Sequence, residues 1–213
     1  MSRYILGIDA GTSVIKAALF DRDFRESHAV RRRTTVSMPR PGWTECSMDE
    51  IWAMTAEALR AITAQVPPHD IAAVALTGNM VGAWLLDADG RPARAAILWS
   101  DGRAQEQIDR FTAQRPNFMT VIFRSSGSVM QQGCTLPVLR WLIEHEPDVI
   151  ARTRHVISCK GWLIYNLTGA VQLDVTEVPG MPGDIRRRSY SDAMFDWLQV
   201  SELRGLFPSV VPS

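Results

Sequence analysis

A short turn near the amino terminus carries the residues with the clearest chemistry. It reads Asp9-Ala10-Gly11-Thr12-Ser13 and separates two apolar runs. A tight turn between two strands can direct several backbone N–H groups at one point and so bind an anion. Gly11 permits a positive φ and the close approach of a phosphate, and the hydroxyls of Thr12 and Ser13 add donors. The turn predicts a phosphate-binding hairpin, with an ordinary hairpin turn as the alternative.

Two charged residues flank this turn. Asp9 cannot bind a phosphate itself, but its carboxylate can hold a hydrated Mg²⁺ that bridges to phosphate oxygens. Lys16, three residues after the turn, would add a compact positive charge. The spacing G-x-x-x-x-G-K-[ST] is absent, which excludes a Walker A loop, and the turn is not a Rossmann fingerprint either.

The composition narrows the class of protein. The chain has 213 residues, of which 46% are hydrophobic, so it can bury a core and form one domain or two small ones. Lys+Arg and Asp+Glu are both 23, which argues against a nucleic-acid binder that relies on bulk charge. Cys46, Cys134 and Cys159 form no CxxC pair, and we expect reduced, buried thiols. With no signal-peptide pattern and no run of ~20 apolar residues, the sequence predicts a cytoplasmic protein that contacts no membrane.

The pattern of apolar residues predicts that strands come first. The runs Tyr4–Ile8, Val14–Phe20 and Ser27–Val36 are joined by turn residues, which indicates a β-meander. A capping box at Ser47–Glu50 predicts the start of a helix that ends at Pro67 and Pro68. The apolar run Ile71–Leu76 then predicts a buried strand.

Helices dominate the second half of the chain. Thr135 is the expected N-cap of one helix and Gly169 the expected C-cap of another. Together the patterns predict an α/β fold that begins with a meander rather than a βαβ unit. The expected strands are Val81–Leu86 and Ala95–Trp99, and the expected helices are Asp101–Phe111, Thr135–Glu146, Lys160–Leu167 and Ser191–Leu198.

One longer run contains the Asp9–Ser13 turn, namely G-I-D-A-G-T-S-V-I-K-A-A-L-F-D from Gly7. This run resembles the first phosphate motif of the FGGY family of carbohydrate kinases. Further blocks follow in the family's order over nearly the whole chain. They are P-G-W-T-E (Pro41–Glu45), L-T-G-N-M-V-G (Leu76–Gly82), L-L-D-A-D-G-R-P (Leu85–Pro92), A-I-L-W-S-D-G-R-A (Ala96–Ala104), L-R-W-L-I-E-H-E-P (Leu139–Pro147) and C-K-G-W-L-I-Y-N-L-T-G (Cys159–Gly169).

The resemblance implies a ribonuclease-H-like, actin-like ATPase fold, with a mixed sheet and helices on both of its faces. It implies an ATP-dependent kinase with Mg²⁺, whose two domains enclose the active site. Residues 1–213 would be most of the amino-terminal, sugar-binding domain. The catalytic Asp and the carboxy-terminal nucleotide-binding domain would lie beyond Ser213, so this chain alone would be inactive. An exposed apolar edge would favour self-association, as in a homodimer.

The resemblance also assigns site residues. Gly11, Thr12, Ser13 and Lys16 would bind phosphate, and Asp9 would hold Mg²⁺ through water. Asn79, Met80 and Val81 fall where the family contacts sugar hydroxyls. Trp99 falls where an aromatic ring packs on substrate carbons, although a core tryptophan is the alternative. Asp101 and Arg103 would order the loop beside the site rather than do chemistry.

The substrate and the class of function stay open. Kinases for D-xylulose usually have His at the position of Val81, and glycerol kinases have an Arg–Glu pair at Met80 and Val81. The chain has neither, so we expect a pentulose or tetritol, that is, a four- or five-carbon polyol or ketose. The alternatives are a non-catalytic sugar- or phosphate-binding remnant, an interaction module, or an actin- or Hsp70-like ATPase lobe.

Overall fold

The computed structural model describes residues 3–213, which form two compact units. The first unit consists of residues 3–36 and Ser47–Asn79, and the second of Ser37–Cys46 and residues 80–213. The chain therefore passes from the first unit to the second and back before it enters the second again.

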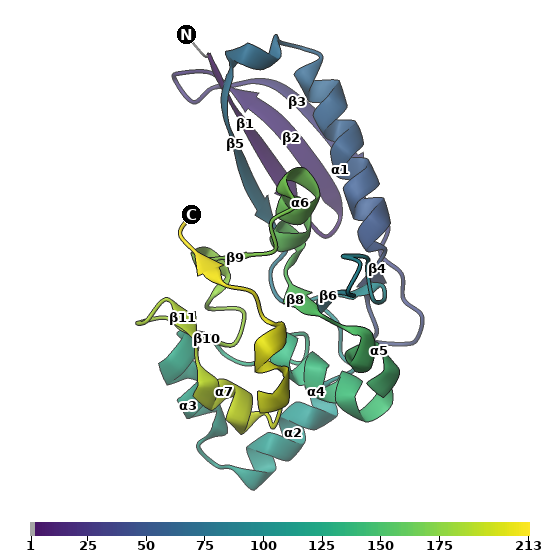
Figure 1. Ribbon diagram of the computed structural model, residues 1–213, viewed down its shortest axis with the longest axis vertical. Helices are drawn as coiled ribbons and strands as arrows, with labels where there is room; N and C mark the ends of the chain where they lie inside the picture. The colour runs from purple at the N-terminus through teal and green to yellow at the C-terminus, as the bar shows by residue number, and fades with distance from the viewer. Residues whose placement is uncertain (1–2) are drawn as a thin grey trace. The chain divides into compact units, whose positions relative to one another are not determined.

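The first unit is built on a four-stranded mixed sheet (Figure 1). Strands β1 (Tyr4–Ala10), β2 (Val14–Phe20) and β3 (Glu26–Arg33) form an antiparallel meander. Strand β5 (Ile71–Gly78) pairs parallel with β1, which gives the order β3-β2-β1-β5. The predicted meander is confirmed. It could be predicted because alternating apolar residues and short polar turns specify it locally.

Helix α1 (Met48–Thr63) packs against β2 and β3 and covers one face of this sheet (Figure 1). The hydroxyl of Ser47 accepts a hydrogen bond from the N–H of Glu50 at 3.2 Å, so the predicted cap is present. The helix ends at Thr63, before Pro67, and the short 3₁₀ turn η1 (Pro68–Asp70) leads into β5. Apolar residues that alternate along the strands are buried on this side, namely Leu6, Ile8, Ala10, Ile15, Ala17 and Leu19.

The expected burial of β5 is wrong. Residues 72–75 of this strand are exposed, and the side chain of Val74 is 52% exposed. A run of apolar residues shows that a strand can be buried, but the strand becomes buried only where another helix or strand packs on it. In the described part of this unit, β5 pairs only with β1, and α1 lies on β2 and β3.

The second unit has a helical core with short strand pairs (Figure 1). Its sheets each contain two strands, pairing β4 with β7, β6 with β8, β9 with β12 and β10 with β11. The strands are β4 (Glu45–Cys46), β6 (Trp84–Leu86), β7 (Ala96–Ile97), β8 (His155–Ile157), β9 (Leu173–Asp174), β10 (Gly183–Asp184), β11 (Ser189–Tyr190) and β12 (Val210–Val211). The helices are α2 (Gln105–Gln114), α3 (Phe118–Ser126), α4 (Thr135–His145), α5 (Pro147–Arg152), α6 (Cys159–Thr168), η2 (Val175–Glu177), α7 (Asp192–Trp197) and η3 (Ser201–Leu206).

Several predicted boundaries in this unit change for local reasons. Helix α2 begins four residues after Asp101, whose carboxylate is bound to Arg103. Thr135 is the first residue of α4 and not its N-cap, because its hydroxyl donates to Met181 Sδ at 3.2 Å. The predicted strand from Val81 shortens to β6, since Val81 has a φ of 56°. The Gly169 cap of α6 is confirmed, with a φ of 75°.

Candidate active-site residues

The turn between β1 and β2 is held on both sides. The N–H of Gly11 donates to the carbonyl of Val14 at 3.0 Å. The N–H of Thr34, after β3, donates to the carbonyl of Ser13 at 3.1 Å, and the Thr34 hydroxyl donates to the carbonyl of Thr12. A Cβ at Gly11 would lie 2.9 Å from the Val14 carbonyl oxygen, so only glycine fits this turn without a shift. The hairpin is therefore a fixed feature of the first unit.

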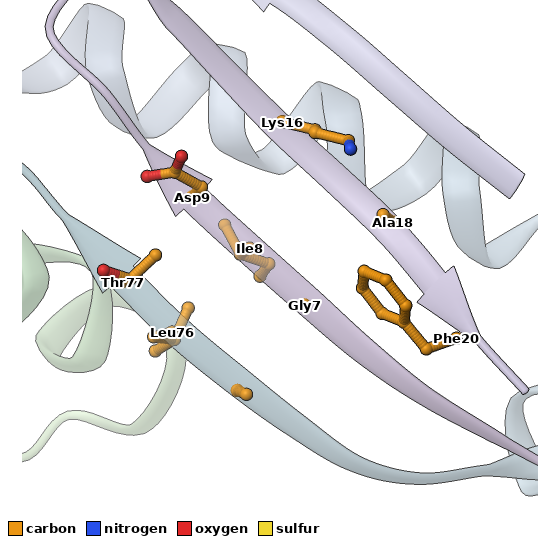
Figure 2. Close-up of a pocket in the computed structure, with 9 residues that line it drawn as sticks. Gly7, Ile8, Asp9, Lys16, Ala18, Phe20, Leu76 and Thr77 are labelled. Carbon is orange, nitrogen blue, oxygen red and sulfur yellow. The ribbon is translucent and has the colours of Figure 1, made fainter. Parts of the chain in front are cut away.

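Asp9 lies beside the turn at the end of β1, with an exposed side chain. In the sheet register it is level with Lys16 of β2 and Thr77 of β5. The face of the sheet that carries Asp9, Lys16 and Thr77 is hollowed by a cavity of about 360 Å³ (Figure 2). The cavity is lined by Gly7, Ile8, Asp9, Lys16, Ala18, Phe20, Ala75, Leu76 and Thr77.

Lys16 is paired within the sheet. Its ammonium forms an ion pair with Glu26 of β3, and the hydrogen bond from Lys16 is the main cause that lowers the pKa of Glu26. Figure 2 shows the side chains of Lys16 and Asp9 directed away from each other. The structure thus brings Asp9 and the turn together and holds the Lys16 ammonium on Glu26.

Asn79 follows β5, and its main chain and side chain are both anchored at the end of β1. Its N–H and its Nδ2 both donate to the carbonyl of Ala10, at 2.9 and 3.2 Å. Its Oδ1 is buried and has no hydrogen-bond partner among the described residues. Since β1 and β5 are parallel, Asp9 and Asn79 lie at the same end of adjacent strands, the end at which α/β sheets bind ligands. Asn79 Oδ1 is thus a buried acceptor whose hydrogen-bonding capacity is unused among the described residues.

In the second unit, Met80 and Val81 lie on a strained turn. Val81 is β-branched and has a φ of 56°, a conformation that costs about 1–3 kcal/mol. The next residue, Gly82, donates its N–H to the carbonyl of Gly133 at 3.1 Å. The side chain of Met80 is 42% exposed. Backbone strain of this kind is concentrated at functional sites, where the surrounding structure maintains it.

Trp99 belongs to the same unit and is half-exposed, at 48%. Its backbone is contacted by Gly133, where an added Cβ would lie 1.8 Å from the Trp99 carbonyl oxygen. Gly133 therefore touches both the Met80–Gly82 turn and the Trp99 backbone, and no side chain fits in its place. Gly133 was not predicted from the sequence, since a glycine before a helix normally indicates only a loop.

A buried ion-pair network holds the loop that follows Trp99. Arg103 Nε and Nη2 lie 2.8 and 2.9 Å from the two carboxylate oxygens of Asp101, and Nη2 lies 2.6 Å from Glu45. The guanidinium also stacks on Trp43, 4.0 Å from the ring centroid. Burial disfavours the cation, but the hydrogen bonds with Asp101 and Glu45 outweigh it and raise the pKa of Arg103. The blocks Pro41–Glu45 and Ala96–Ala104 are thus joined by charge and stacking.

Residues 3–213 contain no helix that is long and apolar enough to cross a membrane. The same residues contain no group of three or more His, Cys, Asp or Glu side chains that could hold a metal ion.

Comparison with known proteins identifies the family. Residues 4–213 match the model of the N-terminal domain of the FGGY family of carbohydrate kinases. The chain is 34% identical to the xylulose kinase of Escherichia coli over 92% of this chain and 40% of that protein. It is 32% identical to the erythritol kinase of Brucella abortus over 97% of this chain and 40% of that protein. The chain thus spans less than half the length of these curated relatives.

Solved structures agree with the fold prediction. The crystal structure of a xyloylose kinase from Brucella ovis matches 98% of this chain and 43% of that chain, with a TM-score of 0.87 and 32% identity. The α/β fold of the actin-like type, with a mixed sheet that starts with a meander, is confirmed. The chain belongs to the FGGY family of carbohydrate kinases, and it corresponds to the family's N-terminal domain.

Proposed function

We propose that this chain is the sugar-binding part of an ATP-dependent kinase that phosphorylates a four- or five-carbon polyol or ketose. The observation that carries the proposal is the shared position of Asp9 and Asn79. Both lie at the same end of parallel strands β1 and β5, beside a fixed glycine turn, in a chain of the carbohydrate-kinase family. The names of the relatives, xylulose kinase and erythritol kinase, support a five- or four-carbon substrate.

On the phosphate side, Gly11, Thr12 and Ser13 would direct donors at the nucleotide phosphates. An exposed carboxylate such as Asp9 suits Mg²⁺, which usually keeps several waters and takes one or two carboxylates plus phosphate oxygens. The metal would supply charge neutralisation on the transferred phosphoryl group. Lys16 is paired with Glu26, so it would bind a phosphate only where the phosphate replaces Glu26 as the partner of its ammonium.

On the sugar side, the buried Oδ1 of Asn79, which has no hydrogen-bond partner among residues 3–213, would accept a hydrogen bond from a substrate hydroxyl that reaches it. In the second unit, Met80 and Val81 offer apolar contacts, and the exposed ring of Trp99 offers a flat surface for C–H groups. The Asp101–Arg103–Glu45 network would fix the Trp99 loop without touching substrate.

Phosphoryl transfer depends on positioning and on electrostatic stabilisation from both sides of the reacting group. We therefore propose that catalysis needs a second domain joined to this chain, which supplies the general base for the sugar hydroxyl and the adenine pocket. We call this chain joined to that second domain the complete polypeptide.

Ligand binding by the isolated chain gives the first test. Each solvated hydrogen bond contributes only about 0.5–1.5 kcal/mol, against association costs of ~4 kcal/mol or more, so we expect millimolar sugar affinity at best. Saturation-transfer NMR should detect weak binding of a tetritol or pentulose, and calorimetry should detect no micromolar ATP binding.

Two variants control this experiment. Trp99→Ala removes the proposed stacking surface and should lower the transferred saturation. Phe24→Ala removes another exposed aromatic ring, 77% exposed and located in the first unit, and should leave the signal unchanged. Micromolar ATP binding, or sugar-dependent ADP release by this chain alone, would contradict the need for a second domain.

A further inference from the structure

The turn Glu177–Met181 contacts the two apolar residues of the proposed sugar surface. We propose that Gly180, in this turn, is a specificity-determining position of the kinase. By lacking a side chain, Gly180 lets the turn pack directly on Met80 and Val81, and so sets the shape that these two residues present to the substrate. The inference rests on the proposed function and adds a residue that the resemblance in sequence did not assign to the site.

The contact at Gly180 leaves no room for a methyl group. An added Cβ would lie 2.6 Å from Val81 Cγ1 and 3.4 Å from Met80 Cε. The first of these distances is shorter than real contacts allow, so a neighbour must move. Gly180 does not have a positive φ, and its backbone conformation is one that other residues adopt readily. The requirement for glycine at this position therefore comes from space beside Val81 and not from the backbone.

The turn Glu177–Met181 is held in place and cannot easily move away from Val81. The N–H groups of Gly180 and Met181 both donate to the carbonyl of Glu177 at 3.0 Å. Met181 is buried, and its sulfur accepts the hydrogen bond from Thr135 of α4. The turn is thus fastened to the helical core on the side that follows Gly180.

The other side is fastened by a buried charge cluster. The carboxylate of Glu177 is 3% exposed and lies 3.3 Å from the ammonium of Lys160, the second residue of α6. The same ammonium lies 3.1 Å from Asp174 and 2.8 Å from the hydroxyl of Thr176. Moving Glu177 would separate buried opposite charges, which is strongly unfavourable. A side chain at Gly180 is therefore accommodated by Val81 and Met80 rather than by the turn.

Val81 cannot yield through its backbone without losing other contacts. Its φ of 56° is already strained, and the N–H of the following Gly82 is bound to Gly133. The adjustment falls on the side chains of Val81 and Met80, which changes the surface beside the substrate. Because the chemistry is performed elsewhere, the change should raise KM more than it lowers kcat.

The test is a double-mutant cycle in the complete polypeptide, with KM and kcat measured over four- to six-carbon polyols and ketoses. Gly180→Ala should raise KM for the best wild-type substrate at least tenfold and lower kcat less than threefold. Val81→Ala removes Cγ1, so Gly180→Ala in that background should change KM less than threefold. Gly205→Ala is the matched control, because a Cβ at Gly205 meets nothing within 4 Å, and its KM and Tm should equal those of the wild type.

Other outcomes overturn the inference. An unchanged KM in Gly180→Ala, or an equal KM increase with and without Val81→Ala, would show that the contact does not shape the site. If Gly180→Ala alone does not fold, the proposal requires that the double variant Gly180→Ala, Val81→Ala folds and is active. A double variant that is also unfolded would contradict the proposal. A wild-type protein that phosphorylates no polyol or ketose refutes the proposed function instead, and the two failures are thereby distinguished.

Discussion

Replacing Asp9 by Asn in the complete polypeptide should lower kcat about a hundredfold or more, while KM for the sugar changes less than threefold. The substitution keeps the shape of the side chain and removes the charge that would orient Mg²⁺ on the transferred phosphate. The side chain is exposed at the end of β1, so the fold should tolerate the change. Steady-state kinetics at saturating ATP and Mg²⁺ measures the effect.

The matched control for this experiment is Asp23→Asn. Asp23 is an exposed carboxylate in the same unit, paired with Arg25 on the surface in the β2–β3 turn. Its replacement should leave both kinetic constants unchanged. Full turnover in Asp9→Asn would mean that Asp9 is only a turn residue, and the assignment of the phosphate side would be wrong.

The second large effect is expected at Arg103. Its side chain is fully buried and is bound to Asp101 and Glu45, so Arg103→Met leaves the buried Asp101 carboxylate without its cation, while Glu45 keeps its ion pair with Arg94. Breaking a buried ion pair by removing one partner costs about 3–5 kcal/mol. We therefore expect the free energy of unfolding, measured by denaturant titration, to fall by about this amount.

Arg187→Met provides the comparison for Arg103. Arg187 lies in the same unit, is 81% exposed and is 3.7 Å from Asp184. Exposed pairs of this kind contribute about 0–1 kcal/mol. Equal losses of stability in the two variants would contradict the proposed role of the network in fixing the loop after Trp99.

The parts of the fold that the sequence predicted correctly are specified by neighbouring residues. The meander follows from alternation within β1 and β2 and from the turn between them. The Ser47 and Gly169 caps follow from side-chain and backbone preferences at single positions. The hairpin of the candidate site was found for the same reason.

The parts that the sequence did not predict depend on contacts between distant residues. Helix α3 (Phe118–Ser126) was missed, because its Thr120, Val121 and Ile122 favour a strand and only burial in the helical core selects the helix. The sequence predicted that a helix starts at Asp101, a residue type that is common at helix starts. In the structure its carboxylate instead accepts hydrogen bonds from the Thr44 N–H and from Arg103. No local pattern shows such pairings.

The candidate site divides in the same way. Asp9 and Gly11 are visible in the sequence because their turn is local. The pairing of Lys16 with Glu26 spans ten residues and crosses to the next strand, so the sequence suggested a phosphate ligand where the structure has an ion pair. Gly133 and Gly180 lie where the folded chain leaves no room for a side chain, which no local pattern in the sequence indicates.

The proposed kinase activity is tested most directly by a coupled ADP-release assay of the complete polypeptide with Mg-ATP and a panel of four- to six-carbon polyols and ketoses. We expect at least one four- or five-carbon compound to stimulate ADP release, and Asp9→Asn to abolish most of that stimulation. A folded wild-type protein whose ADP release is unchanged by every compound in the panel would contradict the proposed function.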